Sequence, residues 1–199
     1  MLSNGAFGGA ISGATARAFG SKNLHLAECI FRSAILISLL GALLMMLLFF
    51  SISERFFIFM KIDQEVSSAA LSYGNILLGG IFLIWLFNII ISITRGSGNT
   101  IMPAFSWLIV LSSHVLLASF NFNYLDGNFI LKNNVVFLSE NYLFNSLEWS
   151  AISLLSGYFF GLIFILGFYF FGNHSYTFKF SKILQFDGFL KLIKSGSLA

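Results

Sequence analysis

The chain has 199 residues, of which 57% are hydrophobic and only 10% charged, and its mean hydropathy is +0.87. A soluble domain carries about 25% charged residues, so this composition excludes a water-soluble globular protein and indicates a polytopic membrane protein. The net charge is only +3. The lone cysteine, Cys29, excludes an intrachain disulfide and a zinc cluster, and we interpret it as a small interfacial filler rather than a reactive thiol.

The first predicted membrane segment, residues 1–19, differs in kind from the later ones. Gly5, Gly9 and Gly13 recur every four residues, so on a helix they form a smooth stripe that lets another backbone approach closely. A signal peptide is the competing interpretation, but the segment has no basic start and no Leu-rich core. Because the segment before Arg17 is short for a span, we expect the second half of a transmembrane helix whose beginning is missing.

Longer apolar segments follow, and each is long enough to cross a hydrocarbon slab, which takes about 20 helical residues. A connection with a short surface helix over 23–31 precedes the first of them. A charged loop and an Asn-rich segment, 121–148, separate the later ones. The predicted spans are 33–53, 67–94, 101–121 and 149–171, and residues 183–199 begin a further helix.

A short polar hinge at 94–103 joins the third and fourth spans, and uncharged runs of 29 and 30 residues flank its Arg95. A phosphate-binding loop is one interpretation of its glycines, but neither the Gly-x4-Gly-Lys-(Ser/Thr) pattern nor a Rossmann strand is present. Gly96 and Gly98 allow the backbone to reverse, and Pro103 is tolerated in the first turn of the next helix. We therefore predict a mechanical hinge.

The charges divide unequally between the two sides of this topology, and an excess of Lys and Arg marks the cytoplasmic side. One side carries six of the eight acids and only three basic residues. We predict a multi-pass protein of the inner or plasma membrane, with the loops near 20–32 and 95–100 and the C-terminal tail in the cytoplasm. That side carries eight of the eleven basic residues: Arg17, Lys22, Arg32, Arg95, Lys179, Lys182, Lys191 and Lys194.

Four segments resemble the multidrug and toxic compound extrusion (MATE) family of transporters. The hinge sequence Arg-Gly-Ser-Gly-Asn-Thr-Ile-Met-Pro at 95–103 is similar to that family's Arg-Gly-x-Gly-(Asp/Asn)-Thr-x-x-Pro turn. Residues 13–28 resemble the end of its second helix and the following cytoplasmic connection. Residues 63–73 resemble the lead-in to its fourth helix, and residues 186–196 the approach to its seventh. The matches lie in family order with family spacing.

The resemblance implies an all-α integral membrane fold of about five transmembrane helices, the first truncated, within one six-helix half of a twelve-helix transporter. It implies export of cationic or amphipathic compounds in exchange for Na⁺ or H⁺, with no other cofactor. The expected partners are the lipid bilayer, the substrate, and the missing first helix and C-terminal half, without which this fragment is not active. The rival within the same superfamily is a lipid-linked saccharide flippase.

The fourth span ends in Asn121-Phe-Asn-Tyr-Leu-Asp126. The resemblance implies a cation or proton role for Asp126, since the family's fifth helix commonly carries Asn-x-x-Leu-Asp there. Asn123 lies three residues before Asp126 and Asn121 five before, where the family has four. Carboxylates within the membrane are costly and usually functional, but at the interface Asp126 would be solvated at little cost, so both interpretations stay open.

Three further groups lie within the spans. His114 is either a protonatable relay or a neutral histidine bonded to a neighbouring helix. Asn88, like Asn75, is either a hydrogen-bond partner between helices or a substrate contact, since buried amides must be satisfied in lipid. Gly157 and Gly161 form a small-residue stripe that we interpret as packing.

The chain carries no Ser/His/Asp set, metal cluster or paired carboxylates at catalytic spacing. We therefore predict a protein that is not an enzyme, with no metal site and no nucleic-acid partner. An integral membrane enzyme or a structural assembly subunit is the alternative from another class, and enzymatic activity without any transport would favour it.

Overall fold

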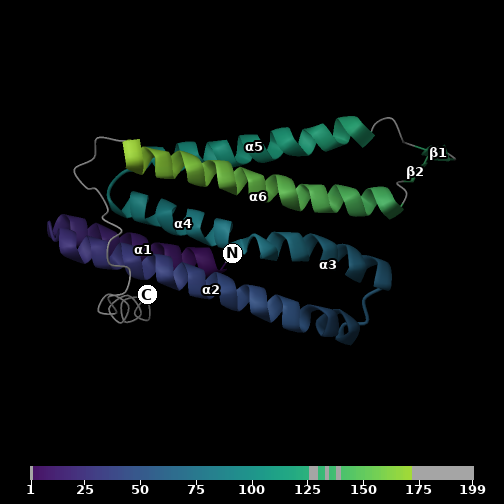
Figure 1. Cartoon of the computed structure of the whole chain (residues 1–199), viewed down its shortest axis with the longest axis horizontal. Coiled ribbons are helices and arrows are strands. Elements are labelled where there is room, and N and C mark those ends of the chain that lie inside the picture. The colour runs from purple at the N-terminus through teal and green to yellow at the C-terminus, as the bar shows by residue number, and fades with distance from the viewer. Residues whose placement is uncertain (1, 126–129, 133–134, 138–139, 172–199) are drawn as a thin grey trace.

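A computed structural model describes residues 2–125, 130–132, 135–137 and 140–171 of the chain (Figure 1). The predicted all-helical fold class is confirmed, and a short antiparallel hairpin between the last two helices is an addition to it. The predicted helix start at 183–199 lies outside the described residues. The elements in chain order are α1 (Leu2–Gly20), α2 (Leu24–Phe59), α3 (Gln64–Gly79), α4 (Ile81–Gly96), α5 (Ile101–Leu125), β1 (Ile130–Lys132), β2 (Val135–Phe137) and α6 (Glu140–Phe171).

The helices run along the long axis of the molecule, with α1 and α2 on one side, α5 and α6 on the other, and α3 and α4 between them (Figure 1). α4 is the central element because it contacts α1, α2, α5 and α6. Its Ile89 and Ile93 belong to one buried cluster with α1 and α2. Its Phe87 and Ile91 belong to a second cluster with α5 and α6. The core therefore lies on both faces of α4.

Three described helices are long and apolar enough to cross a membrane: 24–59, 101–119 and 147–170. The pair α3 and α4 passes the same criterion as one bent span. Large side chains of these helices face outward, including Leu40 and Leu44 of α2, which are more than half exposed. Such an apolar surface would cause aggregation in water but is stable in contact with lipid. The chain is therefore a multi-pass membrane protein.

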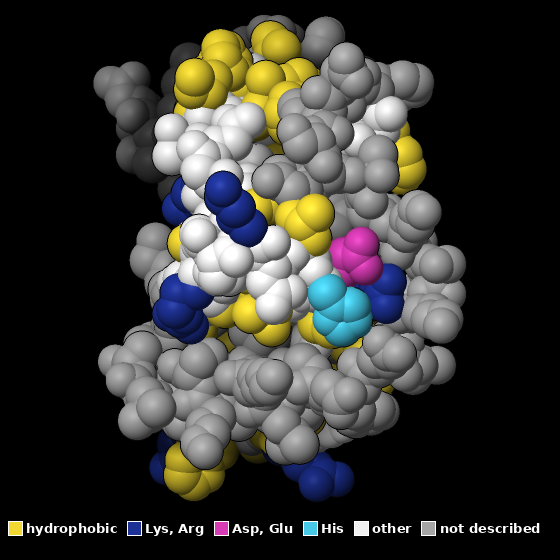
Figure 2. All heavy atoms as spheres, turned by 90° about the vertical axis from the view of Figure 1, so that its left-hand side faces the viewer, with side chains coloured by type: hydrophobic (Ala, Val, Ile, Leu, Met, Phe, Trp, Pro, Cys, Tyr) yellow, Lys and Arg dark blue, Asp and Glu magenta, His cyan; other side chains and the backbone are white. Residues whose placement is uncertain are grey.

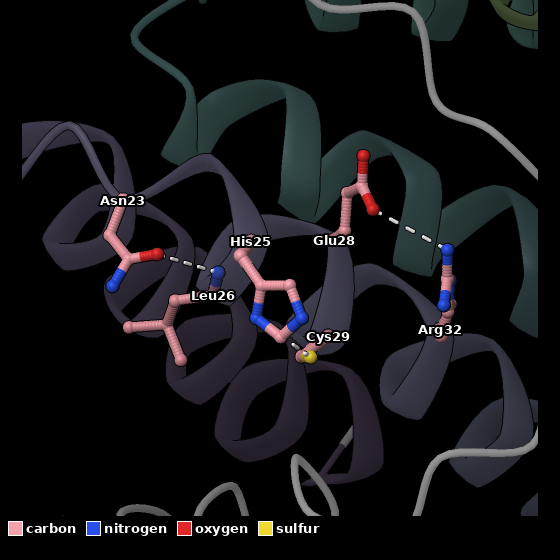
Figure 3. A network of polar contacts seen from close by, with 6 residues as sticks. All are labelled: Asn23, His25, Leu26, Glu28, Cys29 and Arg32. Atoms are coloured by element: carbon pink, nitrogen blue, oxygen red, sulfur yellow. Dashed lines mark hydrogen bonds and ion pairs between the residues drawn. The ribbon is translucent and has the colours of Figure 1, made fainter. Parts of the chain in front are cut away.

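α2 is longer than the sequence predicts. A surface helix over 23–31 separate from the span 33–53 is not found, because one continuous helix runs from Leu24 to Phe59. Asn23 caps it, and its Oδ1 accepts a hydrogen bond from the backbone N–H of Leu26 at 3.0 Å (Figure 3). Arg32, between the two predicted pieces, pairs with Glu28 one turn earlier at 3.4 Å. An ion pair of this kind supports a helix rather than ending it.

The predicted single span over 67–94 is broken into two helices, α3 and α4. The chain bends by 51° between them. The break falls at Gly79 and Gly80, and a Cβ on Gly80 would lie 2.5 Å from Leu155 Cδ1 of α6. The Gly80 N–H donates to the Ile76 carbonyl at 3.1 Å, and the Leu83 N–H donates to the Gly80 carbonyl at 3.0 Å. These bonds satisfy much of the backbone around the break, as a low-dielectric interior requires.

The stripe of Gly5, Gly9 and Gly13 does not make the predicted close contact within the described residues. A Cβ on Gly9 would meet nothing within 4 Å. The neighbouring face of α1 packs on α4 instead, where a Cβ on Gly8 would lie 2.9 Å from Ser92 Oγ. α1 itself is not among the helices that qualify as spans.

α5 and α6 pack closely together where α6 carries the glycines Gly157 and Gly161. A Cβ on Gly157 would lie 2.7 Å from the Val110 carbonyl oxygen, and one on Gly161 would lie 3.3 Å from the Ser106 carbonyl oxygen. Small residues at such positions let two backbones meet, which is the usual basis of helix association in lipid. The packing interpretation of these two glycines is confirmed, and we name this contact the α5–α6 seam.

The seam predicts opposite effects for one substitution at two positions of α6. Gly157→Ala should lower the free energy of unfolding by about 1–3 kcal/mol, because a backbone carbonyl cannot rotate away from the new methyl group. Gly167→Ala should be neutral or stabilising by up to about 1 kcal/mol, since alanine favours the helix and nothing lies within 4 Å of the new methyl group. Unfolding in detergent measures both, and equal effects would contradict the seam.

Candidate functional site

The hinge at 94–103 has the geometry of a tight turn. Gly98 has a φ of 92°, in the left-handed region that glycine adopts without strain. Asn99 Oδ1 accepts a hydrogen bond from the Met102 N–H at 3.1 Å, at the start of α5. Pro103 follows in the first turn of α5, and Gly96 is buried where a Cβ would lie 2.5 Å from the Ser12 carbonyl oxygen of α1. The hinge thus joins α4, α5 and α1 at one end of the molecule.

Basic side chains gather at that same end (Figure 2). Among the described residues it holds Arg17, Lys22, Arg32 and Arg95 with a single acid, Glu28. Arg95 is exposed in the last turn of α4. The opposite end holds Glu54, Arg55, Lys61, Asp63 and Glu65.

The start of α2 carries the remaining polar cluster at the basic end (Figure 3). His25 is exposed, and its Nδ1 lies 3.9 Å from Cys29 Sγ. Among the described residues, no three His, Cys, Asp or Glu side chains gather as a metal site would require. This cluster therefore belongs to the start of α2, which Asn23 caps.

His114 of α5 lies inside the bundle against Ser153 of α6. Its Nδ1 is 3.0 Å from Ser153 Oγ, and Ser153 is only 1% exposed. The Ser153 hydroxyl donates to the Ser150 carbonyl at 2.9 Å. A hydroxyl has one proton to donate, so Ser153 accepts from His114 Nδ1–H when its own proton goes to the Ser150 carbonyl, and it donates to Nδ1 in the other tautomer of the ring.

The same face of α6 holds α5 at two further levels. Trp149 Nε1 donates a hydrogen bond to the Leu117 carbonyl at 2.9 Å. Trp149, Ser153, Gly157 and Gly161 follow one another at intervals of four residues, which places them on one face of a helix. Sequence reasoning found the two glycines and missed the serine, although extending the stripe by one interval reaches it.

The helix break lies at the level of the histidine. Leu155, whose side chain fills the notch at Gly80, is two residues from Ser153 and points to a different face of α6. Transporters bind substrates and ions near the middle of the membrane, where discontinuous helices meet. This level, with His114, Ser153, Leu155 and Gly80, is the candidate functional site.

A second interhelical hydrogen bond lies nearer the basic end. Thr94 Oγ1 is 2.8 Å from the hydroxyl of Tyr169 and donates to the Ile90 carbonyl at 2.7 Å. Tyr169 is the donor to Thr94 when the Thr94 proton goes to the Ile90 carbonyl. This bond ties the end of α4 to the end of α6.

The other sequence candidates are not brought to His114. Asn88 Nδ2 donates to the Ile84 carbonyl of its own helix at 2.7 Å, so this bond does not link two helices. Asn75 is exposed on α3. Asn121 and Asn123 fall in the last turns of α5, where only the backbone is described, and Asp126 lies outside the described residues.

Spanning helices, one pair of them bent at its middle, define a polytopic membrane protein. The MatE family model matches residues 5–120, more than half of the chain. The chain therefore belongs to the MATE family of transporters, and the resemblance at the hinge is confirmed. No curated protein and no solved structure matches it.

The bond between His114 and Ser153 can be tested against another serine of α6. Ser153→Ala should lower the free energy of unfolding by about 0.5–1.5 kcal/mol, since it removes the hydrogen-bond partner of the half-buried imidazole. Ser156→Ala should have a smaller effect, because that exposed hydroxyl bonds only to the Ile152 carbonyl of its own helix. Unfolding in detergent compares them, and a larger loss at Ser156 would contradict the assigned bond.

Proposed function

We propose that the protein acts as a multidrug antiporter that exports organic cations in exchange for Na⁺ or H⁺. The observation that carries this proposal is the meeting of a histidine and a broken span at one level of a MATE-family bundle. A broken helix gives one span two parts that can shift against each other, and an imidazole offers a reversible proton site. Both are means by which a transporter couples ion binding to a change of conformation.

The polar groups of the spans suit a cationic cargo better than the anionic headgroup of a lipid-linked saccharide. Away from the ends of the spans, the described polar side chains are hydroxyl, amide and aromatic groups and one imidazole, over residues 33–53, 66–94, 101–119 and 149–170. Oxygen and imidazole acceptors receive protons and cations, whereas an anionic headgroup is bound by Arg and Lys. Efflux of cations is therefore preferred over the flippase alternative.

Asp126 remains the proposed carboxylate of the cation or proton site, with Asn121 and Asn123 one turn away along the sequence. We further propose that residues 1–199 need other helices to complete a transport cycle. Alternating access moves one repeat against another around a fixed site. The proposed partners are a further helix before α1 and a second six-helix half.

The proposed orientation follows from the basic end described above. The hinge and the start of α2 face the cytoplasm, and the loop between α2 and α3 faces the opposite side, in keeping with the excess of Lys and Arg at the hinge end. The proposed location is the inner or plasma membrane.

Transport can be measured in proteoliposomes that contain the protein expressed from its native gene. An imposed Na⁺ or H⁺ gradient should drive efflux of ethidium, a fluorescent organic cation. Asp126→Asn should lower the driven flux about fivefold or more, a usual size for the loss of coupling between two ligands. Asp63→Asn is the matched control, because Asp63 is exposed at the start of α3.

Each other outcome has a defined meaning. Flux that Asp126→Asn leaves unchanged would remove the role proposed for this carboxylate. Translocation of a fluorescent lipid-linked saccharide without ethidium flux would establish the flippase instead. The absence of both activities would overturn the proposed function.

Orientation can be measured with an impermeant thiol reagent on a Cys29→Ser background. Met60→Cys, at an exposed position between α2 and α3, should react in intact cells. Ser97→Cys, exposed in the hinge, should react only after the cells are permeabilised. The reverse pattern would show that the hinge faces outward.

A further inference from the structure

We propose that the basic end of the bundle is a binding site for an anionic phospholipid, whose phosphate contacts three cations and whose acyl chain lies along α5. The cations are Arg17 in the last turn of α1, Lys22 in the turn before α2, and Arg95 in the last turn of α4. This binding depends neither on transport of a cargo nor on which end of the bundle faces the cytoplasm.

The three cations have no acid of their own. Lys and Arg side chains gather on this end (Figure 2), and Arg17, Lys22 and Arg95 are exposed. The described acid at this end, Glu28, pairs with Arg32 on the same helix at 3.4 Å. No carboxylate among the described residues forms an ion pair with any of the three cations. Their charges therefore attract an anion from the surroundings.

The packing of α1 on α4 brings two of these cations to one level. Gly96 is buried against α1, where a Cβ on it would lie 2.5 Å from the Ser12 carbonyl oxygen, and Arg95 precedes it. The Arg17 side chain folds back along α1, since a Cβ on Gly13 would lie 3.6 Å from Arg17 Nη1. Helical side chains lean in this direction, toward the N-terminus. The Arg17 guanidinium therefore lies beside the turn of α1 that contacts the end of α4.

This direction carries the charge of Arg17 toward the membrane. Beyond Gly13, α1 continues along α4, half of the bent span, to the contact of Gly8 with Ser92. A charged group near hydrocarbon is costly unless water or a partner solvates it. A guanidinium can bind a phosphate through two parallel hydrogen bonds. The phosphate of a lipid lies at the membrane surface, so it is the anion that fits this arginine.

α5 supplies an apolar surface next to the cations. Ile101, Phe105 and Leu108 are each more than half exposed, and their spacing of four and three residues places them on one face of the helix. α5 begins at the hinge that follows Arg95, so this face runs from the basic end into the span. A lipid whose acyl chain covers this face has its headgroup at the hinge. A free phosphate would contact only the cations.

Binding can be measured by the anisotropy of a fluorescent phosphatidylglycerol added to the protein, which is expressed from its native gene and purified in a neutral detergent. Unlabelled phosphatidylglycerol should displace the probe, whereas phosphatidylcholine with the same acyl chains and inorganic phosphate should not. Salt at about 1 M should abolish the preference, since the Debye length is then about 3 Å. Arg17→Gln and Arg95→Gln should each weaken binding about fivefold, the usual contribution of one cation at an anionic surface.

Two lysines in the same backbone conformation provide a matched pair of variants. Lys22 has a φ of 55°, and Lys61, exposed between α2 and α3 at the opposite end, has a φ of 51°. Glycine adopts this region without strain, so neither Lys22→Gly nor Lys61→Gly strains its turn. Lys22→Gly should weaken binding of phosphatidylglycerol about fivefold. Lys61→Gly should keep the wild-type affinity, because Lys61 lies among Glu54, Asp63 and Glu65.

Three results would overturn the proposal. Equal displacement by both lipids would leave the cations only the role of compensating the helix dipoles. Displacement by inorganic phosphate as effective as that by phosphatidylglycerol would show an anion site that needs no lipid. Equal losses in Lys22→Gly and Lys61→Gly would show that the lipid does not bind at the basic end. If an arginine variant fails to fold, the two lysine variants decide.

Discussion

The close approach of α5 and α6 is the contact on which the rest of the structure depends. Gly157 and Gly161 let the two backbones meet, and a Cβ at Gly157 would lie 2.7 Å from the Val110 carbonyl oxygen. In lipid there is little hydrophobic force between helices, so packing of this kind and hydrogen bonds between helices must hold them together. The seam fixes the register that sets His114 against Ser153 and orients Leu155 toward Gly80.

α4 connects this seam to the other half of the bundle. One of its faces packs on α5 and α6 through Phe87, and the other packs on α1 and α2 through Ile89 and Ile93. The break at its start separates it from α3, which contacts α6 and α2. The break thus divides one span into two helices, α3 and α4.

Much of the fold could be predicted from the sequence. The uncharged runs on both sides of Arg95 predicted the two spans that flank the hinge, and the hinge motif predicted the family. Both signals are local in the sequence. The break could not be predicted, because glycine is frequent in transmembrane helices and the filling of the notch at Gly80 by Leu155 depends on packing. The partner of His114 could not be predicted either, because Ser153 lies 39 residues away and is chosen by packing.

Thiol cross-linking across the seam tests its register most directly. On a Cys29→Ser background in native membranes, the pair His114→Cys and Ser153→Cys should be joined by a short bifunctional thiol reagent, with the linked peptides identified by mass spectrometry. The pair His114→Cys and Ile152→Cys should not be joined, because Ile152 is 42% exposed and faces away from the seam. Equal linkage of both pairs, or preferred linkage to position 152, would contradict the arrangement of α5 and α6.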